Sequence, residues 1–351
     1  MHILCYHDQH ILVNEKDFRA DLNFDSDFAN SYLNSPLSLT INAKLDIILY
    51  TMYCIQRIVI NKDAHMNSIA LKAYAKINLG LDVLRRLENG YHEVKMVMQN
   101  VGIYDELTLT KTLQGITVET DHAELPADEN NLVYKAAKLM FEEFRLSGGL
   151  HIQLEKNIPI AAGMAGGSTD AAAVLKGIRE LYGLDVSTKR LMELSVSIGA
   201  DVPYCILGGT ALSQGIGEIL TPLSPMPQCH ILVAKPDINV STKFVYEHLD
   251  AQGVDKHPDI DAMVAAIQAG NLPGILPHME NVLETVTIPA HPIIKEIKQL
   301  MITYGAHASL MSGSGPTVFG IFTDETKAKE AYTKLCKTGV AKQVFLTVPI
   351  S

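Results

Sequence analysis

The stretch IPIAAGMAGGSTDAAAVL, residues 158–175, decides how the rest of the chain can be interpreted. Its glycines allow the backbone to turn tightly and to approach a ligand without Cβ clashes, and an alanine-rich run follows them. If that run is a helix, its first N–H groups are unpaired and lie at the positive end of the helix dipole, which suits an anion. We therefore predict a phosphate-binding loop followed by a helix that begins near Ser168 or Thr169. The alternative is a plain glycine turn with a serine or threonine cap.

Two well-known phosphate-binding motifs do not match this stretch. A Walker A loop has a lysine directly before its serine or threonine, whereas Gly167 precedes Ser168 here. The dinucleotide-binding fingerprint has the spacing G-x-G-x-x-G, whereas the glycines here are Gly163, Gly166 and Gly167. The loop therefore belongs to a different scaffold, which the rest of the sequence has to identify.

The composition is that of a globular protein with room for two domains: 351 residues, 47% of them hydrophobic and 19% charged. The formal net charge of −10 disfavours nucleic acids and anionic membranes as partners, because both require clustered lysine and arginine. No apolar run reaches the roughly 18 residues of a membrane-spanning helix. The five cysteines are widely spaced and form no C-x-x-C pair, which disfavours a zinc site and a disulfide framework. We therefore expect a cytoplasmic protein that acts on a small molecule.

Residues 1–65 differ in character from the rest of the chain. They contain no glycine and show no clear hydrophobic period, whereas a regular pattern begins directly after Met66. We interpret residues 1–65 as an N-terminal extension outside the catalytic fold. The alternative is an appendage that docks on that fold.

The remaining sequence moves between strand and helix patterns. Residues 71–82 have apolar side chains at every second position, which predicts a strand with one buried face. Residues 130–144 have apolar side chains at helical spacing, and a further helix is expected between Ser187 and Gly199. Because strands and helices follow each other without strict alternation, the pattern indicates an α+β fold with largely antiparallel sheets.

Three prolines in PLSPMPQ, residues 222–228, indicate a domain boundary. We predict a first domain of residues 66–226, which contains the glycine stretch, and a second domain of residues 227–351. The second domain contains another glycine loop, in LMSGSGPTVFGIF at residues 310–322. That loop lies between two apolar runs, so it is either a hairpin turn or a second contact to a ligand.

Three further segments contain candidate site residues, and each has a simpler structural explanation. Lys76 and Asn78 lie on the polar face of the first strand, where a lysine is usually solvated. Asp201 follows a glycine that ends a helix, so its carboxylate either accepts a proton from a substrate hydroxyl or caps the next helix. Tyr91 and His92 follow a turn, where they either hold a planar base or are ordinary strand residues.

The order of these segments is more informative than any one of them. A strand with K-I-N, then P-x-x-x-G-x-x-G-G-S-[ST], then G-A-D-V-P, then S-G-S-G-P resembles the GHMP kinase superfamily, from Ser68 to the C-terminus. The resemblance implies ATP-dependent phosphorylation of a small-molecule alcohol. It also implies a two-domain fold, with an N-terminal ribosomal protein S5 domain 2-like part and a C-terminal ferredoxin-like α/β part. The segment NGYHEV is most similar to the branch that phosphorylates the 2-hydroxyl of a cytidylyl-linked methylerythritol in the non-mevalonate isoprenoid route, rather than homoserine or mevalonate.

The resemblance also implies roles for individual residues. Asp201 would be the general base, with Lys76 as its electrostatic partner at the reacting hydroxyl. Substrate would contact Asn78, Tyr91, His92, Thr242 and Tyr246. ATP would lie along Ala162, Gly163, Met164, Ala165, Gly166, Gly167, Ser168 and Thr169, with Asn131 and Lys156 nearby. No acidic Mg²⁺ ligand is evident, so the metal would be held mostly by ATP, with Ser168 or Thr169 as a protein ligand. We expect a monomer or a weak homodimer.

Overall fold

The computed structural model describes residues 2–6, 9–13 and 67–351. The chain divides into two compact units, Met1–His65 and Met66–Ser351. In the first unit, β1 (His2–Tyr6) pairs antiparallel with β2 (Gln9–Val13). The interpretation of residues 1–65 as an extension falls largely outside the described residues and stays a prediction. The site and its chemistry lie in the second unit.

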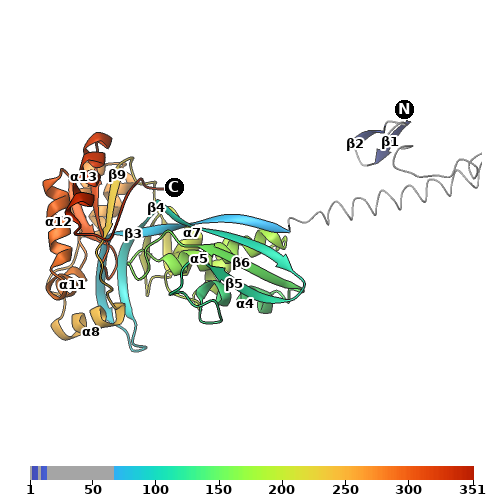
Figure 1. Cartoon of the computed structure of the whole chain (residues 1–351), viewed down its shortest axis with the longest axis horizontal. Coiled ribbons are helices and arrows are strands. Elements are labelled where there is room, and N and C mark those ends of the chain that lie inside the picture. Colours follow the sequence, from blue (N-terminus) through green and yellow to red (C-terminus); the bar gives the residue numbers. More distant parts are fainter. Residues whose placement is uncertain (1, 7–8, 14–66) are drawn as a thin grey trace, which may run out of the picture. The chain divides into compact units, whose positions relative to one another are not determined.

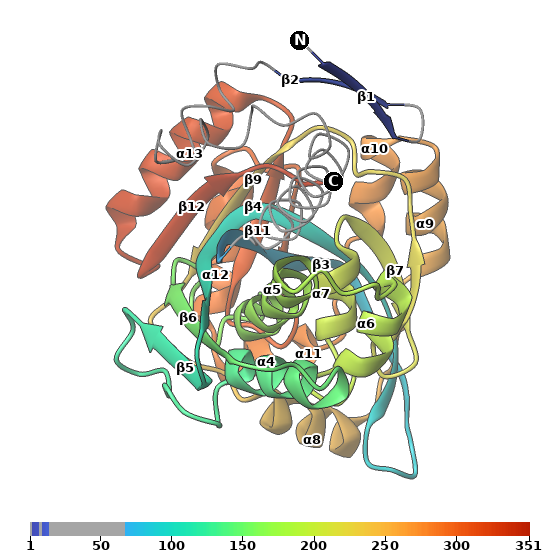
Figure 2. The same cartoon turned by 90° about the vertical axis from the view of Figure 1, so that its right-hand side faces the viewer.

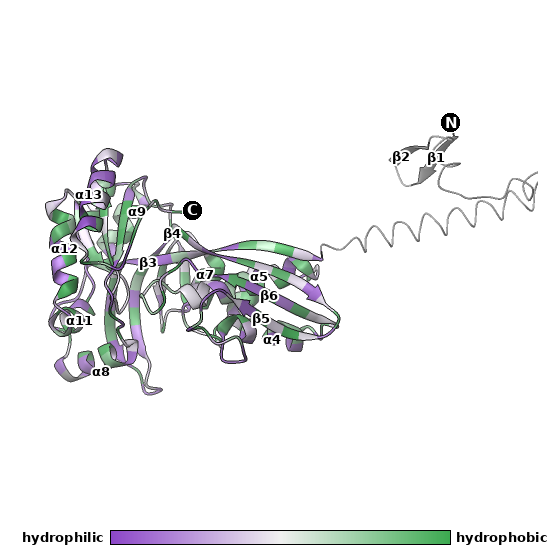
Figure 3. Ribbon diagram, viewed as in Figure 1, coloured by the Kyte–Doolittle hydropathy of each residue, from purple (hydrophilic) through white to green (hydrophobic). Residues whose placement is uncertain are grey.

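The second unit begins with a sheet built around two long strands (Figure 1). β3 (Ser68–Arg86) and β4 (His92–Thr112) pair antiparallel, with three shifts of register along their length. β6 (Gly149–Glu155) and β7 (Thr210–Gln214) both pair antiparallel with β4, β5 (Gly115–Thr120) runs parallel to β6, and β8 (Ile219–Pro222) closes the other edge. Exposed and half-buried residues alternate along β5, and Figure 3 shows the mixed hydropathy of this strand.

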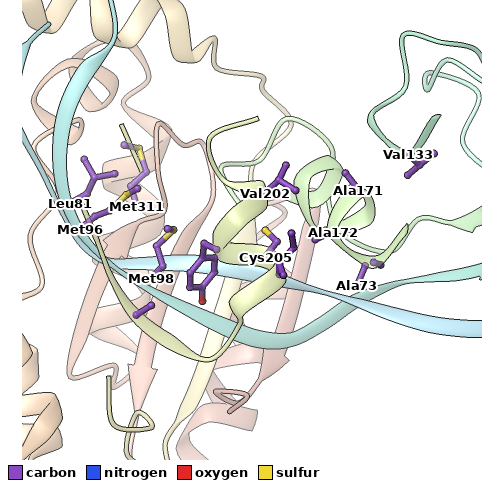
Figure 4. Close-up of a cluster of buried hydrophobic side chains, with 14 of the residues drawn as sticks. Ala73, Leu81, Met96, Met98, Val133, Ala171, Ala172, Val202, Cys205 and Met311 are labelled. Carbon is purple, nitrogen blue, oxygen red and sulfur yellow. The ribbon is translucent and has the colours of Figure 1, made fainter. Parts of the chain in front are cut away.

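Four helices lie together on one face of this sheet (Figure 2). They are α4 (Leu132–Glu143), α5 (Gly166–Leu181), α6 (Thr188–Ser195) and α7 (Val202–Leu207). α5 contacts α4, α7, β3 and β4, and its buried side chains include Ala171 and Ala172 (Figure 4). At Gly177 a Cβ would lie 2.4 Å from Leu71 Cδ1, so any larger residue there would require the Leu71 side chain to shift. The small residues of the alanine-rich run therefore let the helix pack tightly under the glycine loop.

The C-terminal part of the unit has its own antiparallel sheet. β9 (His230–Lys235) lies between β11 (Val318–Phe322) and β12 (Gln343–Thr347), and β10 (Ala308–Met311) pairs with β11. Two helices, α12 (Ile293–Thr303) and α13 (Glu325–Thr338), contact these strands. The remaining helical segments are α8 (Thr242–Gln252), α9 (Ile260–Gln268), α10 (Leu272–Ile275), η1 (Leu276–His278) and α11 (Glu284–Ala290). None of the helices in the described part of the chain is both long and apolar enough to cross a membrane.

Mixed α and β elements with largely antiparallel sheets agree with the α+β prediction. The chain changes from one sheet to the other between Pro222 and His230, within the proline-rich segment, although the exact domain limits stay predictions. Ser187 accepts a hydrogen bond from the Arg190 N–H, as expected for the cap of α6, but that helix ends at Ser195, before the predicted stop at Gly199.

Two sequence-based expectations were wrong in detail. β3 has one buried face only in its first half; from Lys76 to Val83 both faces are buried, because the glycine loop and the C-terminal part of the unit cover the polar face. α5 begins at Gly166, two residues before the predicted start, and the serine or threonine cap of the alternative interpretation is missing. Its N-cap residue is Ala165, in the left-handed conformation and with no side-chain hydrogen bond.

Candidate active site

A cavity of about 920 Å³ collects residues from both sheets and from the loops between them. The glycine loop, the ends of β3 and β4, the start of α7, one side of α8 and the loop between β10 and β11 all contribute. Among the predicted site residues the cavity is lined by Lys76, Asn78, Tyr91, His92, Asn131, Lys156, Ala162, Gly163, Ala165, Gly166, Gly167, Ser168, Asp201, Thr242 and Tyr246.

Lys76, Asn78 and Asp201 form the polar centre of this cavity. The Lys76 Nζ lies 3.7 Å from a carboxylate oxygen of Asp201 and donates a hydrogen bond of 2.8 Å to the Asn78 side-chain oxygen. Asp201 occupies the N-cap position of α7, yet its side chain makes no capping hydrogen bond. The alternative role as a helix cap is therefore wrong, and the carboxylate faces the lysine instead. Lys76 is only 4% exposed, so its ammonium group acts in a largely desolvated place.

The glycine loop leaves the start of α5 open toward the cavity. Because Ala165 provides no side-chain cap, the first N–H groups of α5 have no capping side chain. The other side of the loop is fixed by the β10–β11 loop, where Ser312 Oγ donates to the Gly163 carbonyl at 2.9 Å. A Cβ on Gly163 would lie 2.2 Å from the Ser312 carbonyl oxygen, and its φ is +73°. Glycine is therefore required where the two loops touch. The late glycine loop is a hairpin connection that also lines the cavity, and its contact with a ligand stays a prediction.

Two residues of the predicted ATP loop do not line the cavity. Met164 is buried and its carbonyl accepts a hydrogen bond from the Lys76 N–H at 3.1 Å. Thr169 is also buried, and its hydroxyl donates to the Tyr74 carbonyl at 2.8 Å. Both residues fasten the loop to β3. Ser168 is the hydroxyl-bearing residue of the pair that lines the cavity.

Lys156 is enclosed by two carboxylates that the sequence reasoning missed. Its Nζ donates to Asp105 on β4 and, at 2.7 Å, to Asp170 on α5. Asp105 also accepts hydrogen bonds from two backbone N–H groups, whereas the second oxygen of Asp170 is buried with no hydrogen-bond partner. Burial therefore raises the pKa of Asp170 well above its usual range; Lys156 counteracts this and Asp105 adds to it. Lys156 keeps its charge, since the two carboxylates raise its pKa although burial lowers it.

Asn131 has a structural contact in addition to its place at the cavity. Its side-chain oxygen caps α4 by accepting a hydrogen bond from the Val133 N–H at 3.1 Å. Its side-chain nitrogen donates to the Pro126 carbonyl at 2.7 Å. Asn131 thus holds the loop before α4 in place, and that loop lines one end of the cavity with Leu125 and Pro126.

The opposite end of the cavity is aromatic. The His92 ring lies against the Tyr246 ring, with centroids 4.6 Å apart and planes 32° apart. Tyr91 next to it is 57% exposed. His92 Nε2 and the Arg86 guanidinium both approach the carboxylate of Asp250 on α8, at 2.7 Å and 3.4 Å. Arg86 and Asp250 are two more cavity residues that sequence reasoning missed.

A pair of hydroxyl groups lies between the aromatic end and the glycine loop. Thr242 Oγ1 and Ser314 Oγ are 2.9 Å apart, and both residues line the cavity. Thr242 is the first residue of α8, whereas Ser314 belongs to the β10–β11 loop. Ser314 is the second serine of S-G-S-G-P, so the sequence contained a signal for it. It was missed because the glycines on either side of it already account for a tight loop.

Metal-binding side chains are scarce in the described part of the chain. No group of three or more histidine, cysteine, aspartate or glutamate residues there is arranged to hold a metal ion. Cys205 lies in α7, four residues after Asp201. Burial raises the pKa of its thiol to about 12. This thiol is thus not poised as a nucleophile.

Comparisons with known proteins agree with this geometry. Residues 131–209 match the family model for the GHMP kinases N terminal domain, and residues 263–341 match that for the GHMP kinases C terminal. A 4-diphosphocytidyl-2-C-methyl-D-erythritol kinase from Lachnospira eligens is 55% identical over 80% of this chain and 98% of its own length. One from Caldicellulosiruptor saccharolyticus is 49% identical over 76% of this chain and 92% of its own length.

Solved structures give the same result for the fold. A crystal structure of 4-(cytidine 5'-diphospho)-2C-methyl-D-erythritol kinase matches with a TM-score of 0.70 and 32% identity, over 81% of this chain and 100% of its own. A homoserine kinase from Cytophaga hutchinsonii matches with a TM-score of 0.64 and 21% identity, over 80% of this chain and 93% of its own. The second match concerns the fold alone. The predicted two-domain GHMP kinase fold is confirmed.

Proposed function

Because the chain belongs to the 4-diphosphocytidyl-2-C-methyl-D-erythritol kinase family of the GHMP kinases, we propose that it phosphorylates the 2-hydroxyl of 4-diphosphocytidyl-2-C-methyl-D-erythritol. ATP is the phosphoryl donor, and the products are the 2-phosphate and ADP. The observation that carries this proposal is the cavity itself. An open helix N-terminus, a buried lysine paired with a carboxylate, and an aromatic end line one continuous space.

Asp201 is the general base of the proposed reaction. Its carboxylate takes the proton of the 2-hydroxyl as the oxygen bonds to the γ-phosphorus, and the bond from that phosphorus to the ADP oxygen breaks. Lys76, 3.7 Å away, orients the carboxylate and offsets negative charge that develops on the transferring group. Asn78 holds the lysine by accepting its hydrogen bond of 2.8 Å, while the Asn78 side-chain nitrogen donates to Met96 Sδ at 3.2 Å. Desolvation around Lys76 strengthens both effects.

The start of α5 holds the phosphates of ATP in this proposal. Its uncapped N–H groups and the dipole of a helix from Gly166 to Leu181 both favour an anion there. The loop before α4, with Asn131, and the Lys156 region line the nucleotide end of the cavity. Mg²⁺ would arrive with ATP and neutralise phosphate charge, and the Ser168 hydroxyl fits as its protein contact, since the Thr169 hydroxyl is already donated to Tyr74.

The cytidylyl part of the substrate takes the aromatic end. Tyr91, His92 and Tyr246 are suited to stack on and hydrogen-bond a pyrimidine base. The hydroxyls of Thr242 and Ser314 lie where a diphosphate would connect that base to the reacting alcohol. The cytoplasmic location and the oligomeric state remain predictions.

The test is ADP release by the full-length protein with Mg²⁺·ATP and one of three alcohols: 4-diphosphocytidyl-2-C-methyl-D-erythritol, homoserine or mevalonate. We expect turnover with the first alone. In Asp201→Asn, kcat should fall by about 10²–10⁴, as for loss of a general base, while the dissociation constant of ATP stays the same. The matched control is Asp261→Asn, which removes an exposed carboxylate paired with Lys95 outside the cavity. A near-normal kcat for Asp201→Asn would disprove the base assignment; turnover with another alcohol would disprove the substrate.

A further inference from the structure

Asp250 connects the two parts of the unit at the aromatic end of the cavity. It lies on α8, and its carboxylate receives His92 Nε2 at 2.7 Å and the Arg86 guanidinium at 3.4 Å. Both partners belong to the ends of the β3–β4 hairpin, and all three residues line the cavity. The His92 side chain is 11% exposed, so this contact is shielded from water on most sides.

The carboxylate of Asp250 decides which nitrogen of His92 carries the proton. An ionised carboxylate only accepts hydrogen bonds, so Nε2 must donate and therefore carries a hydrogen. In a neutral imidazole the other nitrogen, Nδ1, is then an acceptor. Within the described part of the chain Nδ1 has no hydrogen-bond partner, and it is not among the buried unsatisfied atoms. The ring also packs against the Tyr246 ring, with centroids 4.6 Å apart and planes 32° apart. His92 thus presents an accessible hydrogen-bond acceptor, Nδ1, at the aromatic end of the cavity.

We propose that Asp250 is a positioning residue that fixes this tautomer of His92, so that Nδ1 reads the exocyclic 4-amino group of the substrate's base. The inference rests on the proposed function and accounts for the selection of cytosine over uracil at that site. The amino group is the only hydrogen-bond donor on the cytosine of a cytidylyl compound, whereas uracil has a carbonyl acceptor at the same position. An acceptor fixed by Asp250 meets a donor in cytosine and another acceptor in uracil. The Arg86 guanidinium also contacts the Asp250 carboxylate, at 3.4 Å.

The direct test of the tautomer is ¹⁵N NMR of the histidine rings in the wild-type protein, with His92→Gln used to assign the signals. Nitrogen chemical shifts separate a protonated nitrogen from an unprotonated one. We expect the hydrogen on Nε2 in wild type. A hydrogen on Nδ1 would overturn the proposal, and this measurement needs neither substrate nor turnover.

The functional test compares kcat/KM for the cytidylyl substrate with kcat/KM for its uridylyl analogue. For wild type we expect a preference for the cytidylyl substrate of about 10- to 100-fold, the size of one unsatisfied buried hydrogen bond. In Asp250→Asn the amide can donate to Nε2, which moves the ring hydrogen to Nδ1 and creates a donor that suits uracil. The preference should fall about tenfold or invert, through KM and not kcat, with the KM for ATP unchanged.

The matched control is Asp261→Asn, whose carboxylate pairs with Lys95 at 2.6 Å instead of with an imidazole and does not line the cavity. It should keep the wild-type preference. Asp250→Asn with the wild-type preference would overturn the proposal even if the cytidylyl substrate is turned over normally. If the wild type turned over no cytidylyl substrate, the proposed function would fail, while the NMR result would still decide the tautomer.

Discussion

Asp105 and Asp170 bind the same lysine, yet replacement by asparagine should affect them in opposite ways. Asp105 accepts hydrogen bonds from Lys156 Nζ and, at 2.6 Å and 2.7 Å, from the N–H groups of Asn157 and Ile158. Asp170 accepts one hydrogen bond, from Lys156, and its other oxygen is buried and unpartnered. Three donors therefore satisfy the carboxylate of Asp105. Burial destabilises the ionised form of Asp170, and the pKa of Asp170 is accordingly raised well above its ordinary value of 3.8.

The raised pKa of Asp170 determines how the free energy of unfolding changes with pH. The unfolded chain releases this proton near pH 3.8, whereas the folded chain keeps it to a higher pH. Between these two values the folded state binds the extra proton, so its stability falls by about 1.4 kcal/mol per pH unit as pH rises. The contribution is fully present below the unfolded pKa and is lost as pH passes the raised, folded pKa. Asp170→Asn has no such proton, and its amide supplies the donor that the protonated carboxyl supplies.

The assay is urea unfolding of the full-length protein at pH 5, 6, 7 and 8, followed by circular dichroism. Asp170→Asn should be at least as stable as wild type at pH 7, and its advantage should grow with pH by up to about 1.4 kcal/mol per unit until the folded pKa is passed. Asp105→Asn, the matched control on the same lysine, should lose about 3–5 kcal/mol at every pH, because a buried ion pair is broken. Equal losses in both variants, or a pH-independent gap for Asp170→Asn, would refute the reasoning.

Two further variants test the loop contact and the base site. Gly163→Ala should lose about 1–3 kcal/mol of stability and raise the KM for ATP, because its φ is +73° and its Cβ would lie 2.2 Å from the Ser312 carbonyl oxygen; thermal melting and ATP titration would show it, and an unchanged melting temperature would contradict the contact. Tyr91→Ala should raise the KM for the cytidylyl substrate but not for ATP, and should change stability by less than about 0.5 kcal/mol because the ring is 57% exposed; equal rises in both KM values would argue against base stacking.

The parts of the site that sequence predicted are those encoded in one short segment. The glycine loop and its helix follow from residues within one turn of each other, so local geometry sufficed. The contact of Lys76 with Asp201 was expected from the resemblance alone, since no local pattern brings β3 next to α7. The structure supports it with a distance of 3.7 Å and with the missing helix cap.

The parts that sequence could not predict depend on contacts between distant segments. Lys156 meets Asp105 and Asp170 across 51 and 14 positions of the chain, and a charged residue on a strand or helix usually indicates a solvated face. Asp250 likewise resembles a surface residue until α8 is placed beside the β3–β4 hairpin. The Thr169 hydroxyl donates to the Tyr74 carbonyl of β3. The sequence of the loop alone does not show that this carbonyl lies next to it.

The charges around the cavity explain why its phosphate loop is rich in glycine and contains no lysine. Each cationic side chain that lines the cavity and has described surroundings lies next to a carboxylate: Lys76 by Asp201, Arg86 by Asp250, Lys156 by Asp105 and Asp170, and Lys243 by Glu247. In a Walker A loop a lysine reaches the terminal phosphates, whereas each lysine that lines this cavity also lies next to a carboxylate. Backbone N–H groups at an uncapped helix, together with the metal ion that accompanies ATP, must then supply most of the compensation for phosphate charge. Glycine is what allows those N–H groups to approach so closely. A chain with a net charge of −10 can therefore bind a polyanion without a basic patch.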